Sequence, residues 1–235
     1  MYPKIRTGRQ IWLMRTAIAI AVCLVLFIGF VYAYDRPGGI ADWRLSREAG
    51  YPGTVKIPLG ETPEDAVLKF RGMPEYQVLL QEKFNRGVLV FTKRNEQSDS
   101  NNNLGIDFVR KTWLGWKWVY GANYGLSVSS DQNEALDFMS IPKYKGINGP
   151  FPIIYGQLAN SAVAGVIVTV GGEAAGEYNA KIISEGVQQR IWYALLPAAA
   201  DKPYKIEALN GEGKAVASKT FDDPTDFGSI MMATK

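Results

Sequence analysis

The chain has 235 residues, 47% hydrophobic and 21% charged, a composition typical of one large or two small globular domains. It contains no histidine and one cysteine. This excludes most catalytic zinc sites, Ser-His-Asp triads and Cys-His pairs, so the sequence predicts no metal and no cofactor. Residues 1–34 hold four basic residues and no acid, which leaves 22 basic against 23 acidic residues and predicts no nucleic-acid partner.

The first predicted element is a transmembrane helix over residues 11–34, after a basic tail over residues 1–10. The charge-free run TAIAIAVCLVLFIGFVYAY (16–34) is just long enough to cross a hydrocarbon core of about 30 Å. The positive-inside rule places the tail in the cytoplasm and the chain from about residue 35 onward outside. The sequence therefore predicts a single-pass protein of the cell membrane, whose partner through residues 11–34 is the lipid bilayer.

A cleaved signal peptide is the alternative interpretation of the same segment. Val31-Tyr32-Ala33 offers residues that signal peptidase accepts before its cleavage site. The charge-free run is longer than the roughly 7–15 residues of a usual signal-peptide core. This length favours an anchor that is retained in the mature protein.

A stalk and a small α+β domain are predicted to follow the membrane segment. Prolines and glycines interrupt residues 35–61, which is typical of a stalk. Residues 62–130 are predicted to form an antiparallel sheet covered on one face by a helix at 63–71, which begins at a threonine cap and ends at Gly72. The expected strands are 76–84, 87–94 and 104–112. A polar loop over 95–103 is expected between the second and the third of them.

The aromatic stretch TWLGWKWVYGANYG (112–125) is predicted to be the next strand and holds the candidate ligand-binding residues. These residues are Trp116, Trp118, Tyr120 and Tyr124. The first three alternate along the strand, so they are expected on one face with Lys117 on the solvent face. This aromatic face is either a core beneath the helix or a stacking surface for sugar rings or apolar side chains. A small domain without disulfides needs its rings inside, which favours the core.

A β-sandwich of immunoglobulin-like size is predicted for residues 151–222, after a linker over 131–150 and before a C-terminal tail over 223–235. Six apolar runs follow one another at short intervals, with a hairpin turn at Asn210-Gly211. The runs are FPIIYG, VAGVIVTV, EYNAKIIS, VQQRIWYALLP, PYKIEAL and KAVASKTF. The predicted fold class is thus mainly β, with an N-terminal transmembrane helix, a small α+β sheet domain and an immunoglobulin-like sandwich.

Four segments carry a resemblance to a known group of proteins. They are GWKWVYG, IIYGQLANSAVAGVIVTV, RIWYALLP and YKIEALNGEGKAV. These segments resemble the sequences of poorly characterised, membrane-tethered envelope proteins of Bacillus-type bacteria, which pair a GWKW-like strand with a C-terminal sandwich. The resemblance implies a location at the cell envelope, without an activity or any functional residue.

The function expected from the sequence is a non-catalytic interaction module whose partner is another envelope protein. The first alternative is a binder of cell-wall glycan or another ligand through the aromatic strand at 116–120. The second alternative is a hydrolase with a Ser-Lys dyad, because this chemistry needs no histidine. It would require a serine hydroxyl within hydrogen-bond reach of a partly buried lysine.

Overall fold

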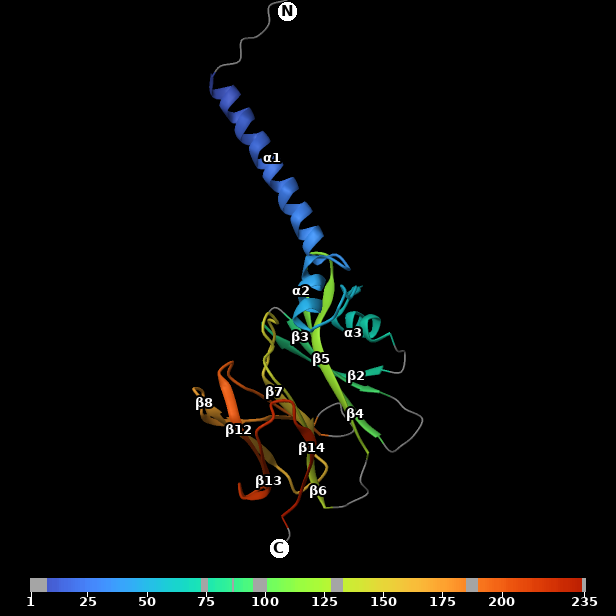
Figure 1. Ribbon diagram of the computed structural model, residues 1–235, viewed down its shortest axis with the longest axis vertical. Coiled ribbons are helices and arrows are strands. Elements are labelled where there is room, and N and C mark those ends of the chain that lie inside the picture. Colours follow the sequence, from blue (N-terminus) through green and yellow to red (C-terminus); the bar gives the residue numbers. More distant parts are fainter. Residues whose placement is uncertain are drawn as a thin grey trace, which may run out of the picture.

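The computed structural model describes residues 8–72, 76–85, 87–94, 101–127, 133–184 and 190–233. These residues form one long N-terminal helix and a body of antiparallel sheets that includes two short helices (Figure 1). The prediction of a mainly β chain behind an N-terminal helix is confirmed. The helices are α1 (Gly8–Asp35), α2 (Ile40–Glu48) and α3 (Pro63–Arg71).

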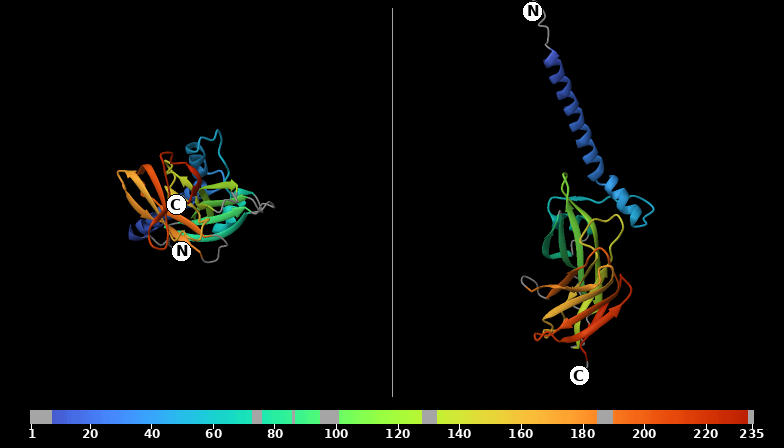
Figure 2. Two further views of the ribbon diagram at one scale, coloured as in Figure 1. Left: turned by 90° about the horizontal axis from the view of Figure 1, so that it is seen from below. Right: turned by 90° about the vertical axis from the view of Figure 1, so that its left-hand side faces the viewer.

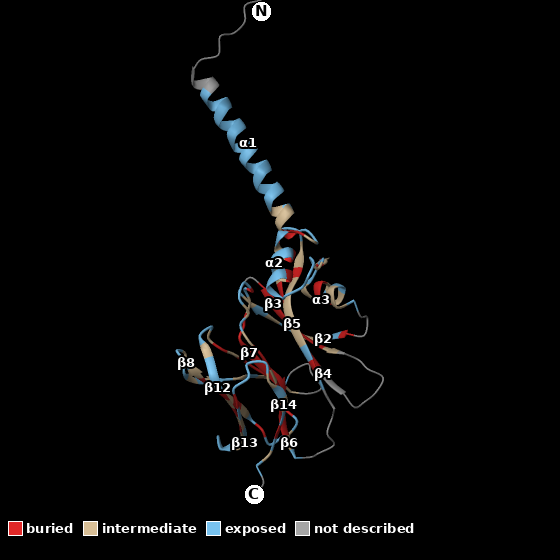
Figure 3. Ribbon diagram, viewed as in Figure 1, coloured by how far each residue is buried: buried red, intermediate tan, exposed pale blue. Residues whose placement is uncertain are grey.

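Helix α1 projects away from the body, and its residues from Trp12 to Phe30 are exposed on every side (Figures 1 and 3). It is long and apolar enough to span a membrane. Its 28 residues correspond to about 42 Å of helix. A helix that is apolar on every side is stable only in an apolar environment. The described body does not cover α1 and therefore does not provide that environment.

The body contains three antiparallel sheets, here named A, B and C. In spatial order, sheet A holds β1 (Leu59–Gly60), β5 (Trp116–Ser127), β4 (Asn101–Lys111), β3 (Gly87–Arg94) and β2 (Tyr76–Phe84). Sheet B holds β10 (Lys181–Ile183), β11 (Ile191–Leu195), β7 (Ile153–Gln157), β6 (Glu134–Ile141) and β14 (Phe227–Met231). Sheet C holds β13 (Ala215–Phe221), β12 (Ala200–Leu209), β8 (Gly165–Gly172) and β9 (Gly176–Asn179).

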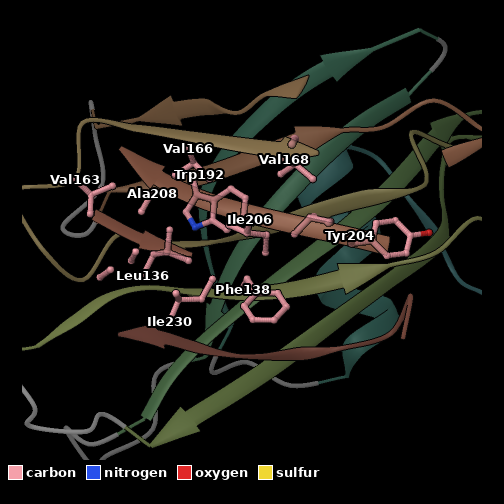
Figure 4. Close-up of a cluster of buried hydrophobic side chains, with 14 of the residues drawn as sticks. Leu136, Phe138, Val163, Val166, Val168, Trp192, Tyr204, Ile206, Ala208 and Ile230 are labelled. Carbon is pink, nitrogen blue, oxygen red and sulfur yellow. The ribbon is translucent and has the colours of Figure 1, made fainter. Parts of the chain in front are cut away.

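Three hydrophobic cores join these layers. One lies between α3 and sheet A and contains Val67 and Val90. A second joins sheet A to sheet B, with Phe91 and Tyr155 among its members. The third joins sheet B to sheet C around Trp192 (Figure 4). The order of layers is therefore α3, sheet A, sheet B and sheet C.

Sheet B is the middle layer and is buried on both faces. In β7, Ile153 and Tyr155 belong to the core shared with sheet A, whereas Ile154 belongs to the core shared with sheet C. All five residues of β7 are buried. This double burial explains why the sequence runs of sheet B are apolar at successive positions instead of alternating.

The helix and hairpin predicted after residue 61 are confirmed. Helix α3 begins where the Thr62 hydroxyl accepts a hydrogen bond of 3.1 Å from the Asp65 amide. It ends at Gly72, which adopts the left-handed conformation with φ 66°. Strands β2 and β3 pair as the predicted hairpin.

The prediction of a stalk over residues 35–61 is wrong where this segment forms regular elements. Residues 40–48 form α2, whose Asp42 and Ser46 are buried. Residues 59 and 60 form β1, which pairs with β5. The prolines and glycines of this segment mark tight turns between packed elements, which from sequence have the same composition as a flexible linker.

Four further predicted boundaries differ from the structure. The linker over 131–150 contains β6, and the tail over 223–235 contains β14, which pairs with β6 in sheet B. Strand β6 is buried at six of its eight residues and therefore lacks the alternation of a half-exposed strand. The predicted strand EYNAKIIS is divided between β9 in sheet C and β10 in sheet B. Of the predicted loop 95–103, residues 101–103 belong to β4, and 95–100 lie outside the described residues.

Candidate functional site

The aromatic stretch forms the start of β5, which lies between β1 and β4 in sheet A. The register between β5 and β4 shifts by one residue, so that Trp118 pairs with Val109 and Tyr120 pairs with Phe108. Such a β-bulge at Val119 interrupts the alternation of side chains. The prediction that three aromatic rings share one face is therefore wrong for Tyr120, which packs in the core between sheets A and B.

The two tryptophans of this strand lie beneath α3. The Trp118 ring stacks on Phe70 of α3, with 3.8 Å between ring centroids. Its Nε1 donates a hydrogen bond of 2.7 Å to Asp107 Oδ1. Trp116 and Trp118 are both half-buried against the valines and alanine of this core. The helix covers the tryptophan face, as the core interpretation predicts.

The two tyrosines of the candidate site belong to the core between sheets A and B, and the Tyr120 ring still lies 6.3 Å from the Trp118 ring. Tyr120 packs against Tyr144 and Phe151, with ring centroids 4.7 and 5.4 Å away. Tyr124 is buried, and its hydroxyl donates a hydrogen bond of 2.5 Å to Asp137 Oδ1 on sheet B. The four candidate residues are thus divided between two cores and do not form one exposed platform.

Lys117, expected on the solvent face, is buried with 1% of its surface exposed. Its Nζ lies 2.6 Å from Asp42 Oδ1 of α2, and both side chains are almost fully buried. The same ammonium group donates hydrogen bonds to the main-chain carbonyls of Asp35, at 2.8 Å, and Arg36, at 3.3 Å. One lysine of sheet A therefore binds both the end of α1 and the start of α2.

Asp42 holds the segment around this lysine in place. Its Oδ2 accepts hydrogen bonds from the amides of Gly38, at 2.7 Å, and Ile57, at 3.0 Å. Asp35 is also buried and forms an ion pair with Arg110 of β4. We call Asp35, Asp42, Arg110 and Lys117 the collar cluster. Because buried charges are tolerated only when paired, the cluster fixes the exit of α1 against sheet A.

A cleft of about 230 Å³ opens beside the collar cluster, at the end of α1. Tyr34 of α1, Arg44 of α2 and Arg110 of β4 are among its lining residues. Two acidic residues, Asp42 and Glu48, also line the cleft. Asp42 is paired with Lys117, whereas Glu48 lies outside the collar cluster. The cleft is small and partly open to solvent, and because Arg110 is paired with Asp35, Arg44 is the guanidinium of its lining that lies outside the collar cluster.

A second buried charge lies under α3, where Asp107 of β4 meets Arg71. The Arg71 guanidinium lies 2.6 Å from Asp107 Oδ1, the same oxygen that accepts the Trp118 indole. Burial raises the pKa of the Asp107 carboxyl, and the nearby Arg71 charge partly offsets this increase. These contacts fasten the last turn of α3 to sheet A.

Asp137 is a fourth buried acid and lies between sheets A and B. Its Oδ1 accepts hydrogen bonds from the Tyr124 hydroxyl and from the Gln157 amide, each at 2.5 Å. Burial raises the pKa of Asp137 to about 7, although these two donors act in the opposite direction. Asp137 therefore changes charge in the pH range in which histidines titrate in other proteins.

The geometry required of a Ser-Lys dyad does not occur in the described part of the chain. The partners of the buried Lys117 are a carboxylate and two carbonyls, and no described serine hydroxyl binds a lysine. Ser140 and Lys143 have the spacing S-x-x-K, but Ser140 is buried in β6 whereas Lys143 is exposed. The described residues also contain no group of three or more metal-binding side chains.

The collar cluster could not be recognised from the sequence. Asp42 and Lys117 are 75 positions apart, and the alternation of β5 predicted an exposed Lys117. A comparison of the chain with protein-family models, curated proteins and solved structures finds no match.

Proposed function

We propose that the chain is a single-pass, membrane-anchored extracytoplasmic protein of the bacterial cell envelope that acts as a non-catalytic interaction module. The observation that carries this proposal is the contact between the end of α1 and the body. Helix α1 is apolar and exposed, and the carbonyl of its last residue, Asp35, accepts a hydrogen bond from the buried Lys117. A helix held in this way keeps the body at a fixed position on the membrane surface.

The proposed orientation places the N-terminus in the cytoplasm and the sheets outside. The four basic residues before residue 16, without any acid, support it. Retention of the anchor is supported by the path of α1, which continues as helix through Ala33 to Asp35. Val31 and Ala33 are partly covered by the body, whereas proteases prefer exposed, extended segments.

The surface that we propose for a protein partner is the edge of sheet B formed by β14. Phe227 and Met231 have 55% and 41% of their surfaces exposed, while Ile230 between them points into the core. Just beyond its two ends β14 contacts β13, through the Asp226–Lys219 ion pair and the hydrogen bond from the Ala233 amide to the Val216 carbonyl, so a partner would cover the exposed side chains rather than add a further strand. We therefore propose an apolar segment of an envelope protein as the partner.

Photocrosslinking in intact cells tests this surface. A photoreactive phenylalanine analogue in place of Phe227 should give one adduct of defined mass. The additional change Met231→Lys should abolish the adduct, because it places a charge on the apolar strip without altering the core. The same analogue in place of the exposed Ser218 on β13 is the control. Equal yields from the two positions would contradict the proposal.

Glycan binding is a second candidate function, and it is supported by the groove beside Trp116. This open groove of about 540 Å³ is lined by Trp116 and Lys111 together with Gln81 and Asn85. The Lys111 ammonium lies 5.1 Å from the centre of the Trp116 ring. An aromatic ring next to amide and ammonium donors suits a sugar, which has apolar faces and hydroxyl groups.

The matched substitutions Trp116→Ala and Trp118→Ala separate binding from stability. Trp118 stacks on Phe70 and binds Asp107, so its loss should lower the free energy of unfolding by about 3–5 kcal/mol. If the groove binds glycan, Trp116→Ala should reduce retention on isolated cell wall by more than its smaller effect on stability explains. Retention equal to that of the unchanged protein would exclude Trp116 as a glycan contact.

We also infer that β6 to β13 form an immunoglobulin-like unit. In chain order they correspond to strands A, B, C, C′, D, E, F and G, because sheet B has the order D-E-B-A and sheet C the order G-F-C-C′. Near the start of β12, the Tyr204 hydroxyl donates to the Ala200 carbonyl at 3.4 Å, which resembles the tyrosine corner of such domains. The disulfide of antibody domains has no counterpart here, since the one cysteine, Cys23, lies in α1.

A further inference from the structure

The tip of the β4–β5 hairpin, Thr112–Gly115, exposes two apolar side chains. Trp113 is 81% exposed, the highest value among the large hydrophobic residues that the structure describes, and Leu114 is 38% exposed. The turn is held by its own hydrogen bonds, because the Thr112 amide donates to the Gly115 carbonyl at 2.8 Å and the Leu114 amide donates to Thr112 Oγ1 at 3.1 Å. This tip is ordered, yet nothing in the described body covers it.

The tip lies beside α1. The rings of Trp113 and Phe27 meet edge to face, with 5.9 Å between their centroids. Phe27 precedes Tyr34, the last residue of the charge-free run, by seven positions, which is about 10 Å along a helix. The hairpin rises beside the C-terminal end of α1 in the right-hand view of Figure 2. If the charge-free run spans the bilayer with Tyr34 at its outer boundary, Trp113 lies at the level of the acyl chains of the outer leaflet.

The chemistry of the hairpin suits this depth. The tryptophan and leucine side chains of the tip are apolar, so their transfer from water into the acyl chains is favourable. Arg110 and Lys111 precede the tip, and no acid occurs between residues 108 and 116. The Arg110 guanidinium is paired with Asp35 and the Lys111 ammonium lies 5.1 Å from the Trp116 ring centre, so the tip itself, residues 112–115, carries no charge. The internal hydrogen bonds of the turn reduce the cost of moving its backbone away from water.

We propose that the β4–β5 tip inserts Trp113 and Leu114 into the outer leaflet of the bilayer as a second membrane contact beside α1. The inference rests on the proposed function, because it requires α1 to span the membrane. With α1 alone, the body could only be held through the collar cluster. With the tip inserted as well, sheet A is attached at two points, and the face that carries α2 and Arg110 is turned toward the headgroups.

Depth-dependent fluorescence quenching tests this contact in the full-length protein. Cys23→Ala removes the single cysteine, and Leu114→Cys then provides one labelling position for an environment-sensitive fluorophore. Glu212→Cys, at an exposed turn of sheet C, is the matched control. The proteins are reconstituted into vesicles of phosphatidylethanolamine and phosphatidylglycerol that contain a nitroxide lipid, with the nitroxide near the ester end of the acyl chain.

We expect several-fold stronger quenching and a blue-shifted emission at position 114 compared with position 212. Trp113→Asp in the same labelled protein should weaken the quenching at position 114, while co-flotation with the vesicles persists through α1. Equal quenching at the two positions, in protein that floats with the vesicles, would overturn the tip contact and leave the anchor intact. Protein that fails to float would reject the anchor, and with it the tip contact.

Discussion

Lys117 shows how a single buried charge can organise a structure. A lysine with 1% exposure is costly unless its charge is compensated, and here the Asp42 carboxylate and two carbonyls supply the compensation. Asp42 in turn binds two backbone amides, so the charge pair is connected to the chain on both sides. The collar cluster therefore gives residues 35–60 a defined structure.

The first prediction concerns this pair. Lys117→Met keeps much of the side-chain volume but leaves the Asp42 carboxylate buried without its counter-charge. We expect the free energy of unfolding to fall by roughly 3–5 kcal/mol. Urea unfolding of the full chain in detergent micelles measures the effect.

Lys214→Met is the control for that measurement. Lys214 pairs with Glu212 at 2.9 Å, but both side chains are largely exposed. The control should change the free energy of unfolding by less than about 0.5 kcal/mol. A Lys117→Met protein as stable as this control would show that the collar cluster does not support the fold.

The second prediction uses the raised pKa of Asp137, which is about 7 in the folded protein against 3.8 as its ordinary value. Below pH 4 the acid is protonated in both the folded and the unfolded state. Between pH 4 and pH 7 the unfolded chain loses the proton while the folded chain keeps it, so stability falls as the pH rises. The loss is on the order of 4 kcal/mol, from about three pH units at 1.36 kcal/mol each.

Asp137→Asn removes this titration and keeps one oxygen that can accept from Tyr124. Urea unfolding between pH 4 and pH 8 should show a decline with pH for the unchanged protein that is steeper than for the variant. The other carboxyl groups, including the buried Asp107, contribute equally to both proteins. Parallel pH profiles would mean that Asp137 is not buried as described.

At the scale of the elements, the third prediction concerns the segment that joins α1 to sheet A. A chain that starts at residue 35 retains Asp42, α2 and β1, whereas a chain that starts at residue 62 loses all three and leaves Lys117 unpaired. We expect the shorter chain to be less stable by roughly 3–5 kcal/mol or to aggregate. Thermal unfolding of the two purified proteins tests this, and equal stability would restore the interpretation of residues 35–61 as a stalk.

The sequence predicted those elements whose signals are local. Helix α3 has a capping threonine and a terminal glycine, and both act within the helix itself. The hairpin of β2 and β3 has apolar runs on either side of a short turn. These elements were predicted close to their observed bounds, because nothing distant is needed to form them.

The errors occur where long-range packing decides. Strand β6 is buried by both neighbouring layers. Strand β14 forms by pairing with β6. The bulge at Val119 appears only in the pairing of β5 with β4. For the candidate site, the tryptophans pack beneath α3, as the favoured interpretation predicted, but the bulge places Tyr120 in the core between sheets A and B. No local pattern encodes any of these features.

At the scale of the whole molecule, the two predicted domains share one core. Phe91 and Ile106 of sheet A pack with Tyr155 and Tyr193 of sheet B. The hydrogen bond from Tyr124 to Asp137 crosses the same boundary. Together with the collar cluster, these contacts connect α1 to sheet A and sheet A to the remaining sheets. These contacts therefore connect α1, through sheet A, to sheet B, which contains β14.

The measurement that tests the central claim most directly is protease accessibility in intact protoplasts that express the chain with a different tag at each end. If α1 is an uncleaved anchor with its N-terminus inside, protease added outside should remove the C-terminal tag and spare the N-terminal tag, which stays in the membrane fraction. Protection of the C-terminal tag would contradict the orientation. A chain that begins at Tyr34 in the culture medium would contradict the anchor itself.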